Sequence, residues 1–340
     1  MRITYNLMAH SWHDMTNIAA ACEESGLHAI AVADSPLVGR ELYVASAACL
    51  QATETLTVMS AVTNPLTRHP SVTAAAVRSL CDISPGRVTV GIATGDSAAW
   101  GAGLRPARIA VLREYIIALK ALLRGEEASW QGQQFRLHWD DARTEQVPAV
   151  LVACSGPKVL RMATEVADGI IPAMGYAQEN IDYVRKLVDN GCRANSRDPD
   201  EFDIWWYADV SFGVSAEVVC ETQLASDAQW LVVGGTEGKL IPPEYIPLLQ
   251  QMHADGHDIQ TSYKNPNRGR QLVERAKGLG LYDWLYERDS RLHGTAEEIG
   301  QRLRELGSRG IDQWCLWQDG GDYPATELPA ALRRALDAGT

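Results

Sequence analysis

The sequence lacks several patterns, and each absence excludes or disfavours a class of protein. No run of eighteen or more apolar residues occurs, which disfavours a membrane-spanning helix. The seven cysteines are scattered and never spaced as Cys-x-x-Cys, which disfavours a disulfide framework or a zinc site; most are expected to be reduced and buried. No lysine-rich or arginine-rich block is present. We therefore expect no metal, no membrane and no nucleic-acid partner.

The signatures of several enzyme and targeting classes are also missing. There is no Gly-x-Gly-x-x-Gly fingerprint, no Walker loop and no Gly-x-Ser-x-Gly elbow, which argues against a Rossmann, a P-loop and a hydrolase assignment. The first fifteen residues lack the basic and apolar regions of a signal peptide, so a cytoplasmic location is expected. The formal net charge is −12, so any phosphate on a ligand would have to be held locally, against the overall field.

What is present is a regular alternation of short apolar runs with helical patterns. Apolar runs of strand type occur at 3–7, 29–33, 56–62, 88–92, 149–154, 169–173, 202–212 and 314–317. Helical patterns occur at 15–25, 41–51, 71–83, 106–123, 158–167, 179–195, 295–308 and 328–336, with Ser71 and Thr295 as expected N-caps. Eight strand–helix units predict a closed TIM (β/α)8 barrel.

One long segment departs from this alternation. Between the seventh and eighth strands, residues 215–292 contain helical pieces and polar turns. We interpret the whole chain, 1–340, as a single barrel domain in which this segment is an insertion over the C-terminal mouth.

Ligands of such barrels bind where the strands end, and four polar or glycine-rich segments follow predicted strands. They are Asp34, then Val62-Thr63-Asn64-Pro65, then Ala93-Thr94-Gly95-Asp96-Ser97, and finally Cys154-Ser155-Gly156-Pro157-Lys158. Any one of these segments alone would be an ordinary turn, because such residues are common in turns. Four of them at one rim of the barrel favour a ligand-binding site. The loop around Gly95 can bring backbone N–H groups close to an anion, and Ser155-Gly156 precedes a helix N-terminus that suits a phosphate.

Acid–base and aromatic candidates are fewer. His10 and His69 are the better proton-transfer candidates because histidine titrates near neutrality. Arg68 is expected to be a structural ion-pair partner. In the predicted strand 202–212, Trp205 and Tyr207 share one face, so they either line the mouth or pack in the core. Trp12 and Trp100 are expected on loops and are further candidates for substrate contacts.

At these residues the chain resembles the luciferase-like superfamily of flavin-dependent monooxygenases and deazaflavin-dependent reductases, and within it the group related to methylenetetrahydromethanopterin reductase. The resemblance is carried by residues 31–36 (AVADSP), 61–70 (AVTNPLTRHP), 84–87 (SPGR) running into 91–97 (GIATGDS), 104–108 (LRPAR), 155–157 (SGP) and 165–170 (EVADGI). It covers about the first half of the chain. No motif between about 200 and 290 can be carried over.

The resemblance implies a TIM barrel with insertions that forms a homodimer or a higher oligomer such as a tetramer. It implies a cofactor ring over the third strand, supported by a bulge and a non-proline cis peptide, which by position would be Ala61–Val62. Thr63 and Asn64 would then lie near the ring or ribityl chain, and Asp34 beside the ring. A phosphate would fall near Gly95, Asp96, Ser97, Ser155 and Gly156. Ser35 stands where many members carry histidine.

The leading functional hypothesis is an FMN-dependent monooxygenase that oxidises a small organic substrate with O₂, with reduced flavin supplied by a separate reductase. The alternative is a reductase or dehydrogenase that uses the deazaflavin coenzyme F420 for hydride transfer. The shared motifs do not separate the two. A third reading is a non-catalytic flavin-binding or structural barrel.

Overall fold

The computed structural model describes residues 1–139, 146–213, 228, 230–254, 268–288, 291–318 and 324–337. Parallel strands form one sheet in the order β11-β10-β12-β1-β2-β3-β4-β7-β8-β9. Their bounds are β1 (Arg2–Leu7), β2 (Ala29–Val32), β3 (Thr57–Thr63), β4 (Val88–Ile92), β7 (Val150–Cys154), β8 (Gly169–Pro172), β9 (Asp203–Ile204), β10 (Trp206–Phe212), β11 (Arg291–Gly294) and β12 (Gln313–Gln318).

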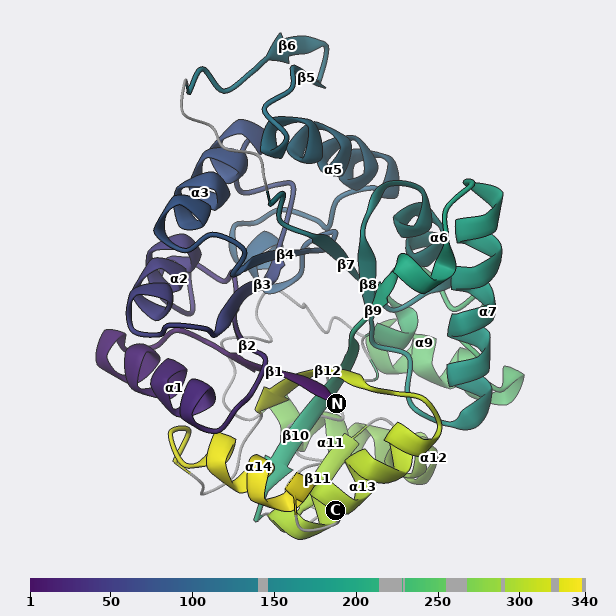
Figure 1. The fold of residues 1–340 in the computed structure, drawn as a ribbon. Coiled ribbons are helices and arrows are strands. Elements are labelled where there is room, and N and C mark those ends of the chain that lie inside the picture. Colours follow the sequence, from purple (N-terminus) through teal and green to yellow (C-terminus); the bar gives the residue numbers. More distant parts are fainter. Residues whose placement is uncertain are drawn as a thin grey trace.

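The sheet curls into the predicted barrel. Only Trp205 separates β9, which pairs with β8, from β10, which pairs with β12. The Trp205 N–H also donates to the Ile170 carbonyl of β8, at 2.9 Å. One continuous segment therefore links the two sides of the sheet. Figure 1 shows the strands arranged in a ring with the helices outside them.

The helices that alternate with the strands cover the outside of the barrel (Figure 1). They are α1 (Trp12–Glu24), α2 (Leu42–Gln51), α3 (Pro70–Ile83), α5 (Ile109–Leu123), α6 (Pro157–Val166), α7 (Gln178–Ala194), α13 (Ala296–Ser308) and α14 (Leu328–Asp337). Smaller elements are α4 (Ser97–Gly101), the turn η1 (Pro199–Glu201) and an antiparallel hairpin of β5 (Ala128–Trp130) and β6 (Gln133–Phe135). Among the described residues, no helix is both long and apolar enough to cross a bilayer.

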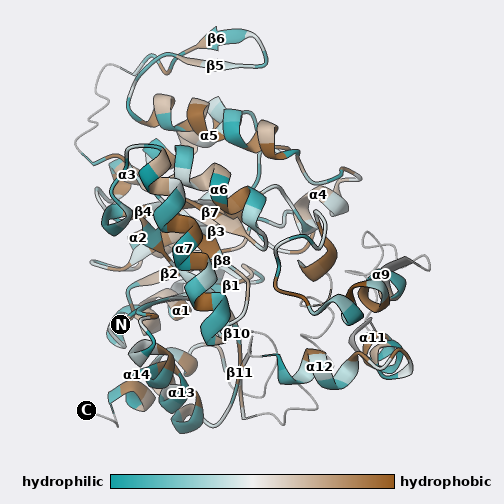
Figure 2. Cartoon of the chain, turned by 90° about the vertical axis from the view of Figure 1, so that its right-hand side faces the viewer, coloured by the Kyte–Doolittle hydropathy of each residue, from teal (hydrophilic) through white to brown (hydrophobic). Residues whose placement is uncertain are grey.

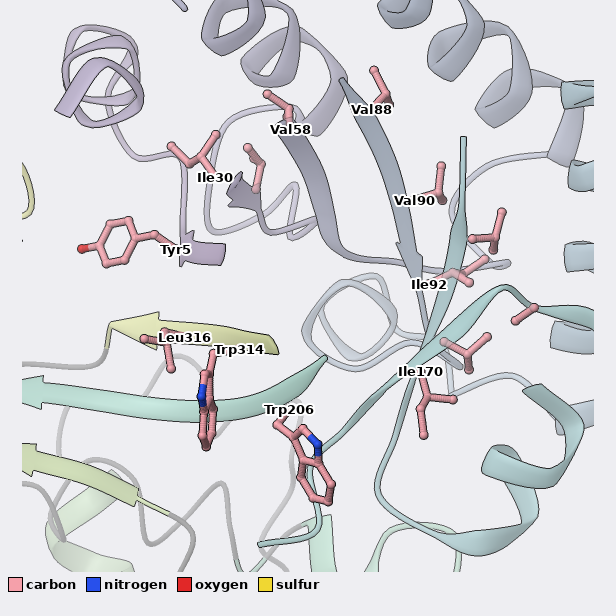
Figure 3. Close-up of a cluster of buried hydrophobic side chains, with 14 of the residues drawn as sticks. Tyr5, Ile30, Val58, Val88, Val90, Ile92, Ile170, Trp206, Trp314 and Leu316 are labelled. Atoms are coloured by element: carbon pink, nitrogen blue, oxygen red, sulfur yellow. The ribbon is translucent and has the colours of Figure 1, made fainter. Parts of the chain in front are cut away.

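The strands are apolar on both faces because helices cover one face and the other lines the barrel interior. Outward side chains such as Val90, Ile170, Trp206 and Trp314 pack against the helices in the main core (Figure 3). Inward side chains form a separate cluster of Ala31, Met59, Leu151, Ile171, Trp205 and Cys315. The alternation read from residues 205–207 is thus confirmed, with Trp206 outward and Trp205 inward.

Part of the predicted insertion is described, and it packs around a core of its own. Its elements are η2 (Pro243–Tyr245), α9 (Ile246–Ala254), α11 (Arg268–Gly278) and α12 (Tyr282–Glu287). Leu249, Met252, Leu272 and Leu285 are buried together there. Figure 2 shows α9, α11 and α12 at the same end of the molecule as α4, opposite the N-terminus. Residues 215–227, 229, 255–267 and 289–290 of this segment lie outside the described residues.

Several predicted boundaries differ from the structure for local reasons. Ser71 is not an N-cap: α3 is capped by His69, whose Nδ1 accepts from the Ser71 N–H, and Pro70 occupies the first turn. The helix predicted from 106 begins at Ile109, and the helix predicted from 15 begins at Trp12 because Ser11 caps it.

Two predicted stretches also contain elements that were not expected. The strand predicted at 202–212 is divided at Trp205, and β11 is an additional strand beside β10. The polar segment 125–147 contains the β5–β6 hairpin, while its residues 140–145 lie outside the described part. The Thr295 cap is confirmed as a capping box with Glu298. The described cysteines are free, and all except the half-buried Cys81 are buried; Cys220 is not described.

Candidate functional site

The strand ends that carry the predicted site residues meet at one end of the barrel. All the pairings in the main sheet are parallel, so the C-terminal ends of β2, β3, β4, β7, β8 and β10 share one rim. Helix α4 and the described helices of the insertion are at this end, whereas the N-terminus is at the opposite one (Figure 2).

Strand β3 is bulged where the cofactor ring was expected. The Ala61–Val62 peptide is cis, and the β3–β4 register shifts between Ser60 and Thr63. The Ser60 hydroxyl bridges the gap, since it donates to the Gly91 carbonyl at 2.8 Å and accepts from the Gly91 N–H at 2.9 Å. A Cβ at Gly91 would lie 2.2 Å from the Ser60 carbonyl oxygen, so only glycine fits beside this bulge. Ala61 and Val62 both border the interior cluster.

Asp34 is held by a buried ion pair at the end of β2. Its Oδ2 accepts from the Thr63 hydroxyl at 2.7 Å and from Arg68 Nη1 at 2.6 Å. Arg68 also donates to Glu41 at 2.8 Å and lies over the Tyr43 ring. The expectation that Arg68 is a structural ion-pair partner is confirmed. This network ties the loops after β2 and β3 together.

Asn64 follows the bulge and has an unsatisfied donor. Its Oδ1 accepts from the backbone N–H groups of Leu66 and Thr67, both at 3.0 Å, which shapes the turn after β3. The residue is 1% exposed, and its Nδ2 is buried with no hydrogen-bond partner in the part of the chain that the structure describes. Buried amide donors are rarely left unpaired, so this N–H points to an acceptor supplied by a ligand.

The loop after β4 lies against these residues. Gly95 has a φ of 101°, and a Cβ there would be 3.5 Å from the Asn64 Cβ and 3.1 Å from the Ala99 Cβ. Ser97, the first residue of α4, shares a short hydrogen bond with Ser35 from the loop after β2. Asp96 is the residue that precedes α4 and makes no side-chain capping bond there, and the Thr94 carbonyl accepts from the Ala107 N–H. The structure thus brings Asp34, Thr63, Asn64, Gly95 and Ser97 into one connected group.

The segment after β7 lines a neighbouring pocket. Gly156 is the N-cap residue of α6 and Pro157 its first helical residue, with no side-chain cap. Cys154, by contrast, is 5% exposed and packs in the main core on the helix-facing side of β7, where burial raises the pKa of its thiol to about 12. Its side chain therefore does not face the mouth, because alternation along β7 directs Leu151 and Ala153 inward instead.

The pocket encloses about 470 Å³, including space open to solvent. It lies between the segments that follow β7 and β8, the first half of β10, and the insertion. It is lined by Ser155, Ala173, Met174, Gly175, Tyr176, Tyr207, Asp209, Trp230, Leu231, Lys239 and Arg288. Tyr207 donates to Asp209 Oδ1 at 2.7 Å, and its ring packs edge-on against Trp230 with centroids 5.2 Å apart.

The two cations of the pocket come from the insertion. Lys239 is 5% exposed, and its Nζ donates to the carbonyls of Trp230 and Val233 at 2.6 and 2.7 Å. Burial, assisted by the charge of Arg288, lowers the pKa of Lys239 to about 8. Arg288 donates to the Met174 carbonyl at 3.3 Å.

Of the residues that line the pocket, the sequence analysis named only Ser155 and Tyr207, and it missed, among others, Tyr176, Asp209, Trp230, Lys239 and Arg288. Only Asp209 carried a usable signal, since the alternation that pairs Trp205 with Tyr207 continues to it. The others come from a segment without recognisable motifs or from the turn after β8.

Other predicted site residues lie elsewhere. Trp205 is at the opposite end of the barrel interior, where it stacks on His28 and lies under Arg2. His10 is exposed, and His69 is exposed, caps α3 and packs on Phe135. The two tryptophans expected on loops are helical, Trp12 at the start of α1 with 47% exposure and Trp100 within α4. The pocket lining includes Tyr207 but none of these five.

Comparison with known proteins agrees with this architecture. The family model of the luciferase-like monooxygenases matches residues 2–313. The 5,10-methylenetetrahydromethanopterin reductase of Methanolobus tindarius is 27% identical over 206 residues, 59% of this chain and 62% of that protein. The F420-dependent glucose-6-phosphate dehydrogenase of Intrasporangium calvum is 34% identical over 171 residues, 46% of this chain and 51% of that protein. The chain thus matches between half and two thirds of the length of these two relatives.

Among solved structures, the coenzyme F420-dependent tetrahydromethanopterin reductase of Methanopyrus kandleri superposes with a TM-score of 0.74 over 99% of both chains, at 18% identity. That likeness concerns the fold. Because the family model spans most of the sequence, the chain belongs to the luciferase-like monooxygenase family.

Proposed function

We propose that this protein is an F420-dependent reductase or dehydrogenase that transfers hydride to or from a small organic substrate. We prefer F420 to FMN because the relative with 34% identity is named as an F420-dependent glucose-6-phosphate dehydrogenase. This proposal differs from the leading hypothesis of the sequence analysis, which was an FMN-dependent monooxygenase. Self-association into a dimer or tetramer is part of the proposal.

The residues after β2, β3 and β4 fit a planar tricyclic cofactor. The small side chains of Ala61 and Val62 border the interior beside Gly91, where nothing larger than glycine fits. Asn64 offers a buried amide N–H that no described residue accepts from, and this donor suits a carbonyl or hydroxyl oxygen of a bound group. We propose that these residues, with Asp34, Thr63, Thr94, Gly95, Asp96 and Ser97, hold the cofactor.

When bound, a deazaflavin supplies two-electron hydride chemistry. The chain itself must then position the substrate and handle the proton that accompanies oxidation of an alcohol or reduction of a carbonyl. Tyr207 and Asp209 form a hydroxyl–carboxylate pair in the pocket wall, with 2.7 Å between the oxygens. We assign to Tyr207 the proton exchange with substrate, and to Asp209 the orientation of the Tyr207 hydroxyl.

The second candidate remains an FMN-dependent monooxygenase served by a separate reductase. The family to which the chain belongs is described as luciferase-like monooxygenases. The same β3 bulge and Asn64 donor would serve an isoalloxazine ring.

Parallel titrations of the purified protein with F420 and with FMN, oxidised and reduced, test the choice. Fluorescence or calorimetry should show micromolar or tighter binding of F420 and much weaker binding of FMN. Tight binding of reduced FMN alone would transfer the assignment to oxygen chemistry. Binding of neither would remove the enzymatic proposal and favour the non-catalytic reading.

A further inference from the structure

A single carboxylate oxygen joins the two ends of the turn that follows β3. Asp34 Oδ2 accepts from the Thr63 hydroxyl at 2.7 Å and from Arg68 Nη1 at 2.6 Å. Thr63 is the last residue of β3, and Arg68 immediately precedes His69, the N-cap of α3. The turn 63–68 is therefore closed by one atom of the loop after β2. We call this arrangement the Asp34 clasp.

The turn inside the clasp holds the Asn64 side chain in one orientation. Asn64 Oδ1 accepts from the N–H groups of Leu66 and Thr67, both at 3.0 Å, and from the Thr67 hydroxyl at 3.3 Å. An amide rotated by half a turn would point its own N–H groups at these donors, so the oxygen faces the turn and the nitrogen faces away from it. A Cβ on Gly95 would lie 3.5 Å from the Asn64 Cβ, so the loop after β4 packs closely on this residue. The shape of the turn thus sets the direction of the Asn64 N–H groups.

The clasp is anchored on α2 and is almost closed to solvent. The Asp34 side chain is 1% exposed and that of Arg68 is 13% exposed. Arg68 Nη2 donates to Glu41 Oε1 at 2.8 Å, while Glu41 Oε2 caps α2 by accepting from the Val44 N–H at 2.9 Å. A buried ion pair adds little net stability compared with apolar side chains of similar size, because both charges lose their hydration. What the pair does provide is a fixed geometry for the turn.

We propose that Asp34 is a positioning residue, which acts through Thr63 and Arg68 to hold the Asn64 amide N–H where the cofactor binds. The inference rests on the proposed function for the presence of a cofactor, and it assigns Asp34 an indirect part in holding it. Asp34 Oδ2 already accepts from both ends of the turn. A turn that is ordered before the ligand arrives raises the affinity, because less conformational entropy is lost on binding.

The Thr63 hydroxyl is the part of the clasp that can be removed without leaving an unpaired charge. Thr63→Val is similar in size and keeps the Asp34–Arg68 pair, whereas loss of either charged partner is expected to destabilise the fold strongly. We expect the affinity of Thr63→Val for the cofactor that the wild type binds, F420 or FMN, to fall about tenfold. Hydrogen exchange in residues 64–68 should become faster. Thr63→Ser retains the hydroxyl and should match the wild type in both measurements.

Thr53→Val is the matched control. Thr53 is also buried, and its hydroxyl donates to the Cys49 carbonyl at 2.8 Å, before β3 and therefore at the opposite end of that strand from the turn. This variant loses one buried hydrogen bond, as Thr63→Val does, but it should leave the cofactor affinity and the exchange of residues 64–68 unchanged. Equal effects in the two variants would reflect general destabilisation and would overturn the proposal.

A double-mutant cycle with Asn64→Asp separates positioning from direct contact. If the clasp acts through Asn64, Thr63→Val should cost little further affinity once the Asn64 donor has been removed. Independent losses that multiply in the double variant would mean that Thr63 contacts the cofactor itself, which would also overturn the proposal.

The exchange measurement distinguishes failure of this proposal from failure of the proposed function. If the cofactor bound Thr63→Val as tightly as the wild type and residues 64–68 exchanged as slowly, the clasp would fail and the proposed function would stand. If the wild type bound neither F420 nor FMN, the proposed function would fail. Faster exchange of the turn in Thr63→Val would then still support the clasp, and unchanged exchange would overturn it.

Discussion

At the scale of single residues, the site depends on side chains whose hydrogen-bonding capacity is only partly used. The Asn64 side-chain oxygen accepts hydrogen bonds within the turn after β3, while its amide nitrogen is buried without a partner among the described residues. Such a group costs free energy in the protein alone and is satisfied when an acceptor binds. The same residue therefore builds the loop and offers the donor.

Asn64→Asp separates these two roles, because it retains the accepting oxygen and removes the donor. We expect the affinity for the cofactor to fall by at least about tenfold, ~1.4 kcal/mol, with little change in Tm. Titration of the variant and a thermal melt measure both. A large drop in Tm with unchanged affinity would mean that Asn64 only shapes the turn.

Tyr207→Phe removes the hydroxyl that faces the pocket and leaves the ring packed on Trp230. We expect kcat to fall about 10²-fold while the affinity for the cofactor stays within a factor of about two. Steady-state kinetics and a cofactor titration check this. His69→Ala is the control, since His69 caps α3 away from the pocket, and its turnover should stay close to that of the wild type.

At the scale of elements, close contacts between neighbouring strands and loops position the site. Strand β3 can bulge beside β4 because Gly91 leaves room for the Ser60 carbonyl and the Ser60 hydroxyl replaces the interrupted ladder bonds. The buried Asp34–Arg68 pair then joins the loops after β2 and β3.

Gly91→Ala would place a methyl group 2.2 Å from a backbone oxygen in the barrel wall. We expect a loss of about 1–3 kcal/mol or more in the free energy of unfolding, together with weaker cofactor binding. Chemical denaturation measures the first effect. The control is Gly278→Ala at the exposed end of α11, where a Cβ meets nothing within 4 Å and stability should be unchanged or slightly higher.

A contact between the end of α1 and the segment before β3 makes the stability of the protein depend on pH. Glu23 at the end of α1 accepts hydrogen bonds from the N–H groups of Glu54, Thr55 and Leu56 and from the Thr55 hydroxyl. Slight burial opposes the shift, but these bonds lower the pKa of Glu23 from 4.5 to about 2. Because the folded pKa is below the unfolded one, the stabilisation is present above pH 4.5 and is lost as the pH falls toward 2.

Glu23→Gln should therefore reduce the free energy of unfolding by about 1 kcal/mol near neutral pH, after allowance for solvent screening. The difference from wild type should shrink between pH 4.5 and pH 2. Denaturation at several pH values measures it. The exposed neighbour Glu24 serves as the control, and a Glu24→Gln variant with the same behaviour would contradict this account.

At the scale of the whole molecule, the described part of the insertion has a hydrophobic core separate from those of the barrel. The barrel and its helices share the main core, while the described part of the insertion buries its own group around Leu249 and Leu285. The pocket lies where the two meet, so its shape depends on how the insertion packs on the rim. In an acidic chain of net charge −12, the insertion also brings the cations Lys239 and Arg288 to that pocket.

Leu249→Ala should loosen the insertion by about 2–5 kcal/mol and leave the barrel protected. Hydrogen exchange should show faster exchange in 230–254 and 268–288, with the barrel strands unchanged. Leu112→Ala, in the main core on α5, should instead lower protection in the barrel. Uniform loosening by both variants would indicate one cooperative unit.

The sequence alone was sufficient for the barrel and for the rim that carries its chemistry. Alternating periods of two and 3.6 residues identify strands and helices locally, and parallel connectivity brings Asp34, Asn64 and Gly95 to the same end. The position of the cis peptide, Ala61–Val62, followed from the family resemblance and agrees with the structure. The capping box at Thr295 is also a local pattern, and it too occurs as predicted.

The set of residues that line the pocket could be identified only from the tertiary structure. Tyr207, the segment that carries Trp230 and Lys239, and Arg288 are separated from one another by tens of residues, and no local period relates them. These side chains come together only because the insertion packs on the rim of the barrel. That packing results from many weak contacts along a segment that contains no recognisable motif. Trp205 illustrates the same limit. Alternation along the strand predicts that its side chain points into the barrel, but its position at the end opposite the pocket depends on the register in which β8, β10 and β12 pair.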